Sequence, residues 1–146
     1  MSEEAAAVIA TASKLGLTVG CAESLTGGLV AAEIVSIPGA STVFRGSIVA
    51  YDSMLKNDLL GVDASTLAST GAVTAEVASA MAEGALARLG VDVAVATTGV
   101  AGPNPDPVSG EAPGAVFIAV AGGGLGTLVR EMSLEEIGRA SCRERV

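Results

Sequence analysis

A helical pattern that leads directly into a β-branched run, within residues 74–98, constrains the fold more than any other feature of the sequence. Thr74 is suited to cap a helix that ends at Leu89, because apolar residues recur near helical spacing and Gly90 follows as a stop. Val91–Thr98 alternates and is β-branched, which predicts a buried strand. We expect this strand to be central in a sheet covered by helices, with its valines buried on both faces.

The rest of the chain continues this alternation of helices and strands. A closing hairpin adds antiparallel strands, so we predict an α/β domain: a three-layer α/β/α sandwich with a mixed sheet. The further helices are expected at Glu4–Leu15, Thr26–Val35, Met54–Leu60 and Asp63–Ala68, the strands at Leu17–Ala22, Val43–Tyr51, Ala115–Ala121 and Leu125–Leu134, and a long loop at Gly99–Gly114.

The composition excludes several classes of function. Half of the residues are hydrophobic and only Phe44, Tyr51 and Phe117 are aromatic, so aliphatic side chains must build the core. Few aromatic stacking groups and a net charge of −8 argue against nucleic acid as a partner. The chain has no histidine, which removes the commonest zinc ligand and the commonest general base. Any catalysis must rely on other groups.

Nothing in the sequence indicates export or membrane insertion. Met1–Glu4 is acidic and lacks the basic start and apolar run of a signal peptide. The longest apolar stretches, such as Ala115–Ala121, are too short to span a bilayer. Cys21 and Cys142 give no disulfide framework, so we expect a cytoplasmic protein with no membrane partner.

The last ten residues, 137–146, differ in character from the rest. They show neither helical nor strand periodicity, and they hold three of the eight basic residues and one of the two cysteines. The run can be back-translated into a common sequencing-library adapter read in frame. We therefore predict a domain over residues 1–136 and a non-native tail over 137–146, although an ordinary polar tail is the alternative.

The first cluster that could carry chemistry is Ala22–Gly28, at a strand-to-helix junction. A serine there lies near the positive end of a helix, where free N–H groups can hold an oxyanion or a phosphate. Glycines allow the backbone to approach a ligand closely. Taken alone, Ser24 or Thr26 is explained equally well as a helix N-cap.

A second cluster, Arg45–Tyr51, is followed by Lys56 in a short helix. Without histidine, a lysine is a suitable base for a serine nucleophile. Its pKa would have to fall by about three units from 10.4, which is within the range that burial produces. The alternative is a solvated surface lysine.

The third cluster, Thr97–Pro103, follows the predicted central strand. Ligands of open α/β sheets gather at the carboxyl ends of strands. The alternative is a tight turn that leads into a surface loop.

Read together, these clusters resemble a known family. Ala22–Gly28, Tyr51 with Lys56, Gly71–Thr74, and Thr98–Pro103 followed by Gly114–Phe117 occur in the order and spacing of nicotinamide-nucleotide amidases, the C-terminal domains of CinA proteins. The resemblance covers about residues 5–134. It implies that the carboxamide of nicotinamide mononucleotide is hydrolysed to nicotinic acid mononucleotide and ammonia, without a metal or cofactor.

The resemblance also implies a role for particular residues. Ser24 would be the nucleophile, Lys56 the base that activates it, and Tyr51 an aid to proton transfer or orientation. The residues implied to line the pocket and bind a small-molecule substrate are Thr26, Gly27, Gly28, Thr98, Gly99, Ala101 and Gly102, with Arg45 as a weaker candidate for a phosphate contact. Assembly into a homo-oligomer is left open.

The sequence departs from the family pattern at two places. Leu25 stands where the family often has cysteine, which a serine mechanism does not need. The adapter-like tail stands where the family continues with a Gly-Asp-Arg motif and a helix. The alternative function is a nucleotide-binding or regulatory module of a competence-related protein, with the same pocket but no catalytic turnover. A Rossmann dehydrogenase is disfavoured because no G-x-G-x-x-G lies between an early strand and helix.

Overall fold

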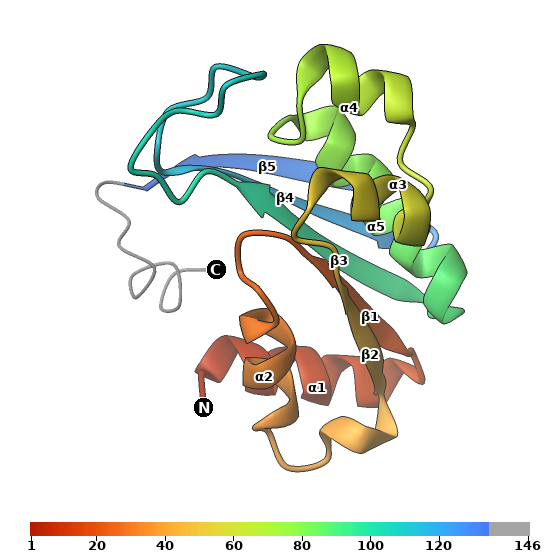
Figure 1. Cartoon of the computed structure of the whole chain (residues 1–146). Coiled ribbons are helices and arrows are strands. Elements are labelled where there is room, and N and C mark those ends of the chain that lie inside the picture. Colours follow the sequence, from red (N-terminus) through yellow and green to blue (C-terminus); the bar gives the residue numbers. More distant parts are fainter. Residues whose placement is uncertain (135–146) are drawn as a thin grey trace.

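A five-stranded mixed sheet forms the centre of the computed structural model, which describes residues 1–134 (Figure 1). The strand order is β2-β1-β3-β4-β5. Strand β1 pairs in parallel with β2 and β3, whereas β3–β4 and β4–β5 are antiparallel. The strands are β1 (Val19–Glu23), β2 (Phe44–Val49), β3 (Val93–Gly99), β4 (Ala115–Gly122) and β5 (Thr127–Ser133).

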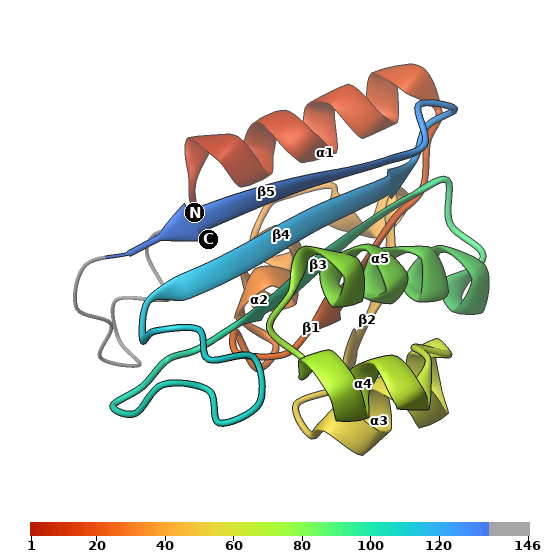
Figure 2. The same ribbon diagram turned by 90° about the horizontal axis from the view of Figure 1, so that it is seen from above.

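Helices cover the two faces of the sheet and complete the predicted α/β/α arrangement (Figure 2). On one face lie α1 (Glu3–Leu15) and α2 (Leu29–Val35), and on the other lie α3 (Ser53–Leu60), α4 (Ala64–Thr70) and α5 (Ala75–Leu89). A short 3-10 turn, Ala40–Thr42, was not predicted. The helix that was expected from Thr26 starts later, because residues 25–28 form a turn.

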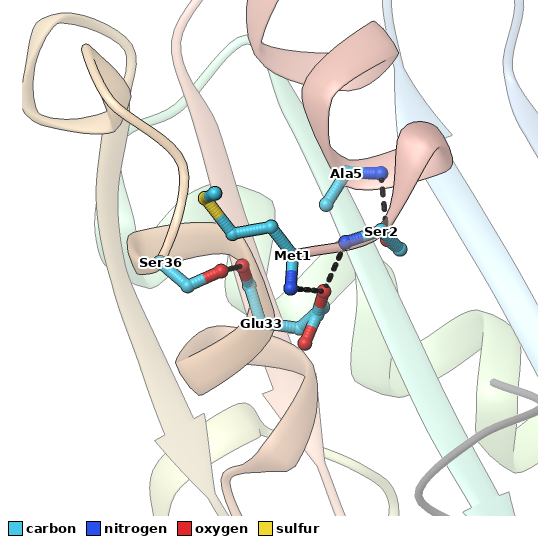
Figure 3. A network of polar contacts seen from close by, with 5 residues as sticks. All are labelled: Met1, Ser2, Ala5, Glu33 and Ser36. Atoms are coloured by element: carbon cyan, nitrogen blue, oxygen red, sulfur yellow. Dashed lines mark hydrogen bonds and ion pairs between the residues drawn. The ribbon is translucent and has the colours of Figure 1, made fainter.

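Local sequence explains where the two longest helices begin and end. The Ser2 side chain accepts a hydrogen bond from the Ala5 N–H at 3.1 Å and starts α1, which ends at Gly16 in the left-handed conformation. Thr74 caps α5 in the same way through the Val77 N–H at 3.1 Å. The N-terminal end of the chain also contacts α2, because the Ser2 N–H donates a hydrogen bond to Glu33 Oε1 (Figure 3).

The third strand is central, as predicted, but its valines are less buried than expected. Ala94 and Ala96 are fully buried against α5. Val93 and Val95 are half-buried. They line an apolar groove of about 540 Å³ between α1, α2 and the sheet. The helices on that face therefore leave part of it open, within the described residues.

The chain path places the carboxyl ends of the parallel strands β1 and β3 side by side. From β1 the chain passes through α2 to β2 on one side, and then through α3, α4 and α5 to β3 on the other side. Strand β1 is thus the point where the connections reverse direction, and such points form a crevice at the carboxyl ends of the strands. Glu23 at the end of β1 is in register with Thr97 of β3. Among residues 1–134, no helix is long and apolar enough to cross a membrane.

Candidate active site

Ser24 lies directly after β1, at the crevice between the parallel strands. Its backbone N–H donates to the Thr97 carbonyl at 3.1 Å, which fixes the turn to the end of β3. The turn then passes through Gly27 and Gly28, whose φ angles of 58° and 102° favour glycine. The Ser24 side chain is buried, with 7% of its surface exposed. The sequence placed this serine correctly at a strand-to-helix junction.

Lys56 approaches Ser24 from the opposite helical layer. Asp52 caps α3 by accepting the Met54 N–H at 2.8 Å, and Lys56 follows in the first turns of this helix. Its Nζ lies 2.9 Å from Ser24 Oγ. The same Nζ donates to the carbonyls of Ala50 at 2.8 Å and Tyr51 at 3.1 Å. With 1% of its surface exposed, Lys56 is not the solvated surface residue that was the alternative.

This geometry suits a neutral amine as well as an ammonium group. A protonated lysine has three donors, and three oxygen atoms surround Nζ. A neutral amine has two donors and a lone pair. The two carbonyls can take the two donors, so the lone pair is left for the Ser24 hydroxyl. The arrangement therefore allows Lys56 to accept the proton of Ser24.

Burial adjusts the pKa of Lys56 toward that role. Loss of hydration lowers the pKa from its ordinary value of 10.5 to about 8, against the opposing effect of the negative Asp52 carboxylate. A substantial fraction of the amine is therefore neutral at slightly alkaline pH. A base with a pKa near the working pH is the most effective general catalyst.

A pocket of about 210 Å³ opens above the Ser24–Lys56 pair. Gly99 and Ala101 lie in its wall. Both belong to the loop that the family resemblance implies for substrate binding. Thr98 also lines it, and its hydroxyl donates to the Ala72 carbonyl at 2.8 Å. The full set of lining residues is Ser24, Leu25, Tyr51, Ser53, Lys56, Ala72, Val73, Thr98, Gly99, Ala101 and Asp106.

Tyr51 is placed differently from the buried pair. Its side chain is 64% exposed and lies at the pocket wall, while its backbone carbonyl holds Lys56. The phenol is therefore available to a bound molecule, and the main chain of the same residue orients the amine.

Thr26 is buried and does not line the pocket. Its hydroxyl donates to Glu23 Oε1 at 2.7 Å and is 2.8 Å from the Thr97 hydroxyl. Gly28 likewise uses its N–H on Glu23, at 3.2 Å. Neither these two residues nor Gly27 and Gly102 belong to the residues that line the pocket.

Arg45 is not brought to this site. It lies in the first part of β2, at a register shift beside the start of β1, whereas Ser24 follows the end of β1. Hydrogen bonds from Thr18 hold the pKa of Asp92, which precedes β3, below its ordinary value, and the positive charge of Arg45 makes a smaller contribution in the same direction.

Sequence reasoning missed the role of Glu23, the residue before Ser24. Its carboxylate is fully buried and accepts five hydrogen bonds that join three elements. The donors are Thr26 Oγ1, the N–H groups of Gly28, Val30 and Ala31, and Ser47 Oγ of β2. The negative charge thus lies at the first turn of α2 and locks the turn that carries Ser24. A glutamate within an otherwise apolar strand was the available signal.

The described residues offer no evident place for a metal ion. No group of three or more cysteine, aspartate and glutamate side chains with metal-binding geometry occurs among residues 1–134. The polar residues of the pocket are two serines, a tyrosine, a lysine, a threonine and an aspartate, and a serine paired with a lysine is suited to acyl transfer.

The larger apolar groove contains no such chemistry. It is lined mostly by aliphatic residues of α1, α2, β1, β3 and β4, and the Ser24–Lys56 pair is not among them. The smaller pocket is therefore the candidate active site, and the domain is of the α/β class with a buried serine–lysine pair at the ends of parallel strands.

Comparison with known proteins assigns the family. Residues 2–146 match the CinA C-terminal domain. The chain belongs to this family. It is 46% identical over 117 residues to a CinA-like protein of Frankia casuarinae and 50% identical over 110 residues to one of Geotalea daltonii. These alignments cover 80% and 75% of this chain but only 26% of each relative, so the chain spans about a quarter of their length.

Solved structures agree with the fold. A competence/damage-inducible protein from Agrobacterium tumefaciens superimposes with a TM-score of 0.90 at 40% identity, covering 97% of this chain and 85% of that one. A competence damage-inducible protein from Klebsiella pneumoniae gives a TM-score of 0.86 at 28% identity, covering 97% and 94%. The predicted family and the predicted mixed-sheet α/β fold are thus confirmed. The predicted tail at 137–146 lies outside the described residues and stays a prediction.

Proposed function

We propose that this domain hydrolyses the carboxamide of nicotinamide mononucleotide, giving nicotinic acid mononucleotide and ammonia. The distance of 2.9 Å between Ser24 Oγ and Lys56 Nζ, within a pocket at the strand ends, carries the proposal. A module that only binds a nucleotide needs neither a nucleophile nor a buried base. Membership of the CinA C-terminal family supports this choice of substrate, because the resemblance to that family implies hydrolysis of the nicotinamide mononucleotide carboxamide.

The reaction proceeds by two acyl transfers. Neutral Lys56 takes the proton of Ser24 as Oγ attacks the carboxamide carbon, and the oxygen of the tetrahedral intermediate becomes negative. Lys56 then returns the proton to the nitrogen, and ammonia leaves. Water, activated by the same amine, attacks the ester and releases the carboxylic acid and Ser24.

The turn after the nucleophile offers donors for the negative oxygen. The N–H groups of Leu25 and Thr26 donate no hydrogen bond within the described part of the chain. Leu25 lines the pocket, and the N–H that follows a nucleophilic serine often stabilises the oxyanion. Removing one donor of this kind typically costs about 100- to 1,000-fold in rate.

Substitution of the two central residues tests the proposal. Ser24→Ala and Lys56→Ala should each abolish ammonia release from nicotinamide mononucleotide, and Tyr51→Phe should reduce it less, because the Tyr51 carbonyl still holds the lysine. Circular dichroism establishes that each variant is folded. Full turnover in Ser24→Ala would overturn the covalent mechanism, and binding without turnover in the unsubstituted chain would favour the nucleotide-binding module.

A further inference from the structure

We infer that Asp106 makes this pocket selective for carboxamides attached to a cationic ring, such as pyridinium, over neutral carboxamides of the same shape. The inference rests on the proposed amide hydrolysis and adds to it the residue that determines substrate charge. Asp106 lies in the loop after β3 and lines the same pocket as Ser24 and Lys56.

The carboxylate of Asp106 is held against the pocket wall. Its Oδ2 accepts hydrogen bonds from the Ser109 N–H at 2.7 Å, the Ser109 hydroxyl at 2.8 Å and the Val108 N–H at 3.2 Å. A Cβ added to Gly71 would lie 3.1 Å from this Oδ2. The next residue, Ala72, is part of the pocket wall. The loop after β3 and the segment between α4 and α5, which contains Gly71 and Ala72, therefore fix the carboxylate beside the cavity.

Asp106 is ionised over the whole range in which the site would work. Burial opposes its charge, but the hydrogen bonds from Ser109 and Val108 outweigh burial and hold the pKa of Asp106 below its ordinary value of 3.8. Its second oxygen, Oδ1, accepts no hydrogen bond within the described residues, so it is available to a ligand.

The charges of the pocket give the selectivity. Among the described residues that line the pocket, Lys56 is the one amine and Asp106 the one carboxylate. Lys56 must be neutral to accept the Ser24 proton, so in the reactive state the carboxylate of Asp106 is the negative charge that the described lining residues place beside the substrate. The nearby Asp52 caps α3 and is not a lining residue. A fixed negative charge in a partly buried pocket attracts a cationic ring and leaves a neutral one unaffected.

The oxidised and reduced forms of nicotinamide mononucleotide provide the test. They share the amide, ribose and phosphate, but only the oxidised ring is cationic. Asp106→Asn should lower kcat/KM for the oxidised form by about 10-fold and change it for the reduced form by less than about 2-fold. The intrinsic reactivities of the two amides differ, but they cancel when each variant is compared with the unsubstituted chain.

Two further variants separate charge from loop structure. Asparagine keeps a carbonyl oxygen for the Ser109 N–H, whereas Asp106→Ala removes it and should weaken turnover of both forms. Glu111→Gln removes one charge from the same loop outside the pocket lining and should change neither. If Asp106→Asn lowered kcat/KM equally for both forms, Asp106 would only stabilise the loop, and the inference would be overturned. An unchanged kcat/KM for the oxidised form would overturn it as well.

A binding measurement keeps this test independent of the proposed reaction. Calorimetry on Ser24→Ala, with and without Asp106→Asn, compares the affinity for the two ring forms without turnover. Tighter binding of the oxidised form that disappears with Asp106→Asn supports the inference even where no ammonia is released, a result that would refute only the hydrolysis. Equal affinities, or no binding of the oxidised form, overturn the inference.

Discussion

At the scale of single residues, Lys56 responds to two opposing influences. Burial lowers its pKa from 10.5 to about 8, and Asp52 raises it. The unfolded chain therefore binds this proton more tightly than the folded chain. Stability consequently rises with pH between about 8 and 10.5, because folding releases this proton in that range and the release costs less free energy as the pH rises.

The same pKa determines how activity depends on pH. Because the neutral amine is the base, kcat/KM should rise through a midpoint near pH 8. Asp52→Asn removes the nearby negative charge and should move this midpoint to lower pH. Asparagine is also a good N-cap, so α3 is retained. The measurement is the pH profile of ammonia release for both proteins, and an unchanged or higher midpoint would contradict the assignment of Lys56 as the base.

How far single residues could be predicted depends on whether their role is local. Ser24 was predicted from its place at a strand-to-helix junction, and the pairing with Lys56 required the family pattern. Glu23 was missed because its contact with Ser47 of β2 forms only in the folded chain. Asp106 was missed because only the fold brings it to the pocket of Ser24 and Lys56. Arg45 was proposed from its cluster, but β2 carries it toward the other end of the sheet.

At the scale of secondary-structure elements, the contact between α3 and α5 positions the base. Gly84 of α5 faces the end of α3, and a Cβ at this position would collide with the Leu60 carbonyl. In an exposed helix, replacing glycine by alanine would stabilise by about 0.5–1 kcal/mol. Here the obstacle is backbone rather than a flexible side chain, so the steric effect outweighs the helix propensity.

Gly84→Ala should therefore lower both stability and activity, because α3 carries Lys56 and would have to move. Ala87→Gly, the reverse exchange at an exposed position of α5, is the matched control and should cost about 1 kcal/mol without changing turnover. Denaturant unfolding and ammonia release measure the two effects. If Gly84→Ala were stabilising with full activity, the close approach of the two helices would not hold in solution.

The elements that were predicted well are those with strong local signals. Thr74, Gly90 and the β-branched run after them predict α5 and β3, although the strand runs over Val93–Gly99 rather than over Val91–Thr98. The start of α2 was predicted too early, because Gly27 and Gly28 adopt left-handed turn conformations. In this turn the Gly28 N–H donates a hydrogen bond to Glu23. A tertiary contact thus decided a local boundary.

At the scale of the whole molecule, the two faces of the sheet are packed unequally. On the α5 face a large cluster surrounds Met81, which is fully buried. On the other face the groove leaves Val8 of α1 43% exposed and Val120 of β4 38% exposed. Hydrophobic burial scales with the area removed from water, so the α5 face contributes more to folding per side chain than the α1 face.

This inequality predicts different costs for truncating one apolar side chain on each face. Met81→Ala should lower the free energy of unfolding by about 2–5 kcal/mol, the range for large-to-small changes in a packed core. Val8→Ala should cost less than about 1 kcal/mol, because half-exposed positions have few contacts to lose. Urea unfolding of both variants at several protein concentrations gives the comparison. Similar costs that grow with protein concentration would mean that another copy of the chain covers the groove in solution, and the α1 face would then belong to an interface.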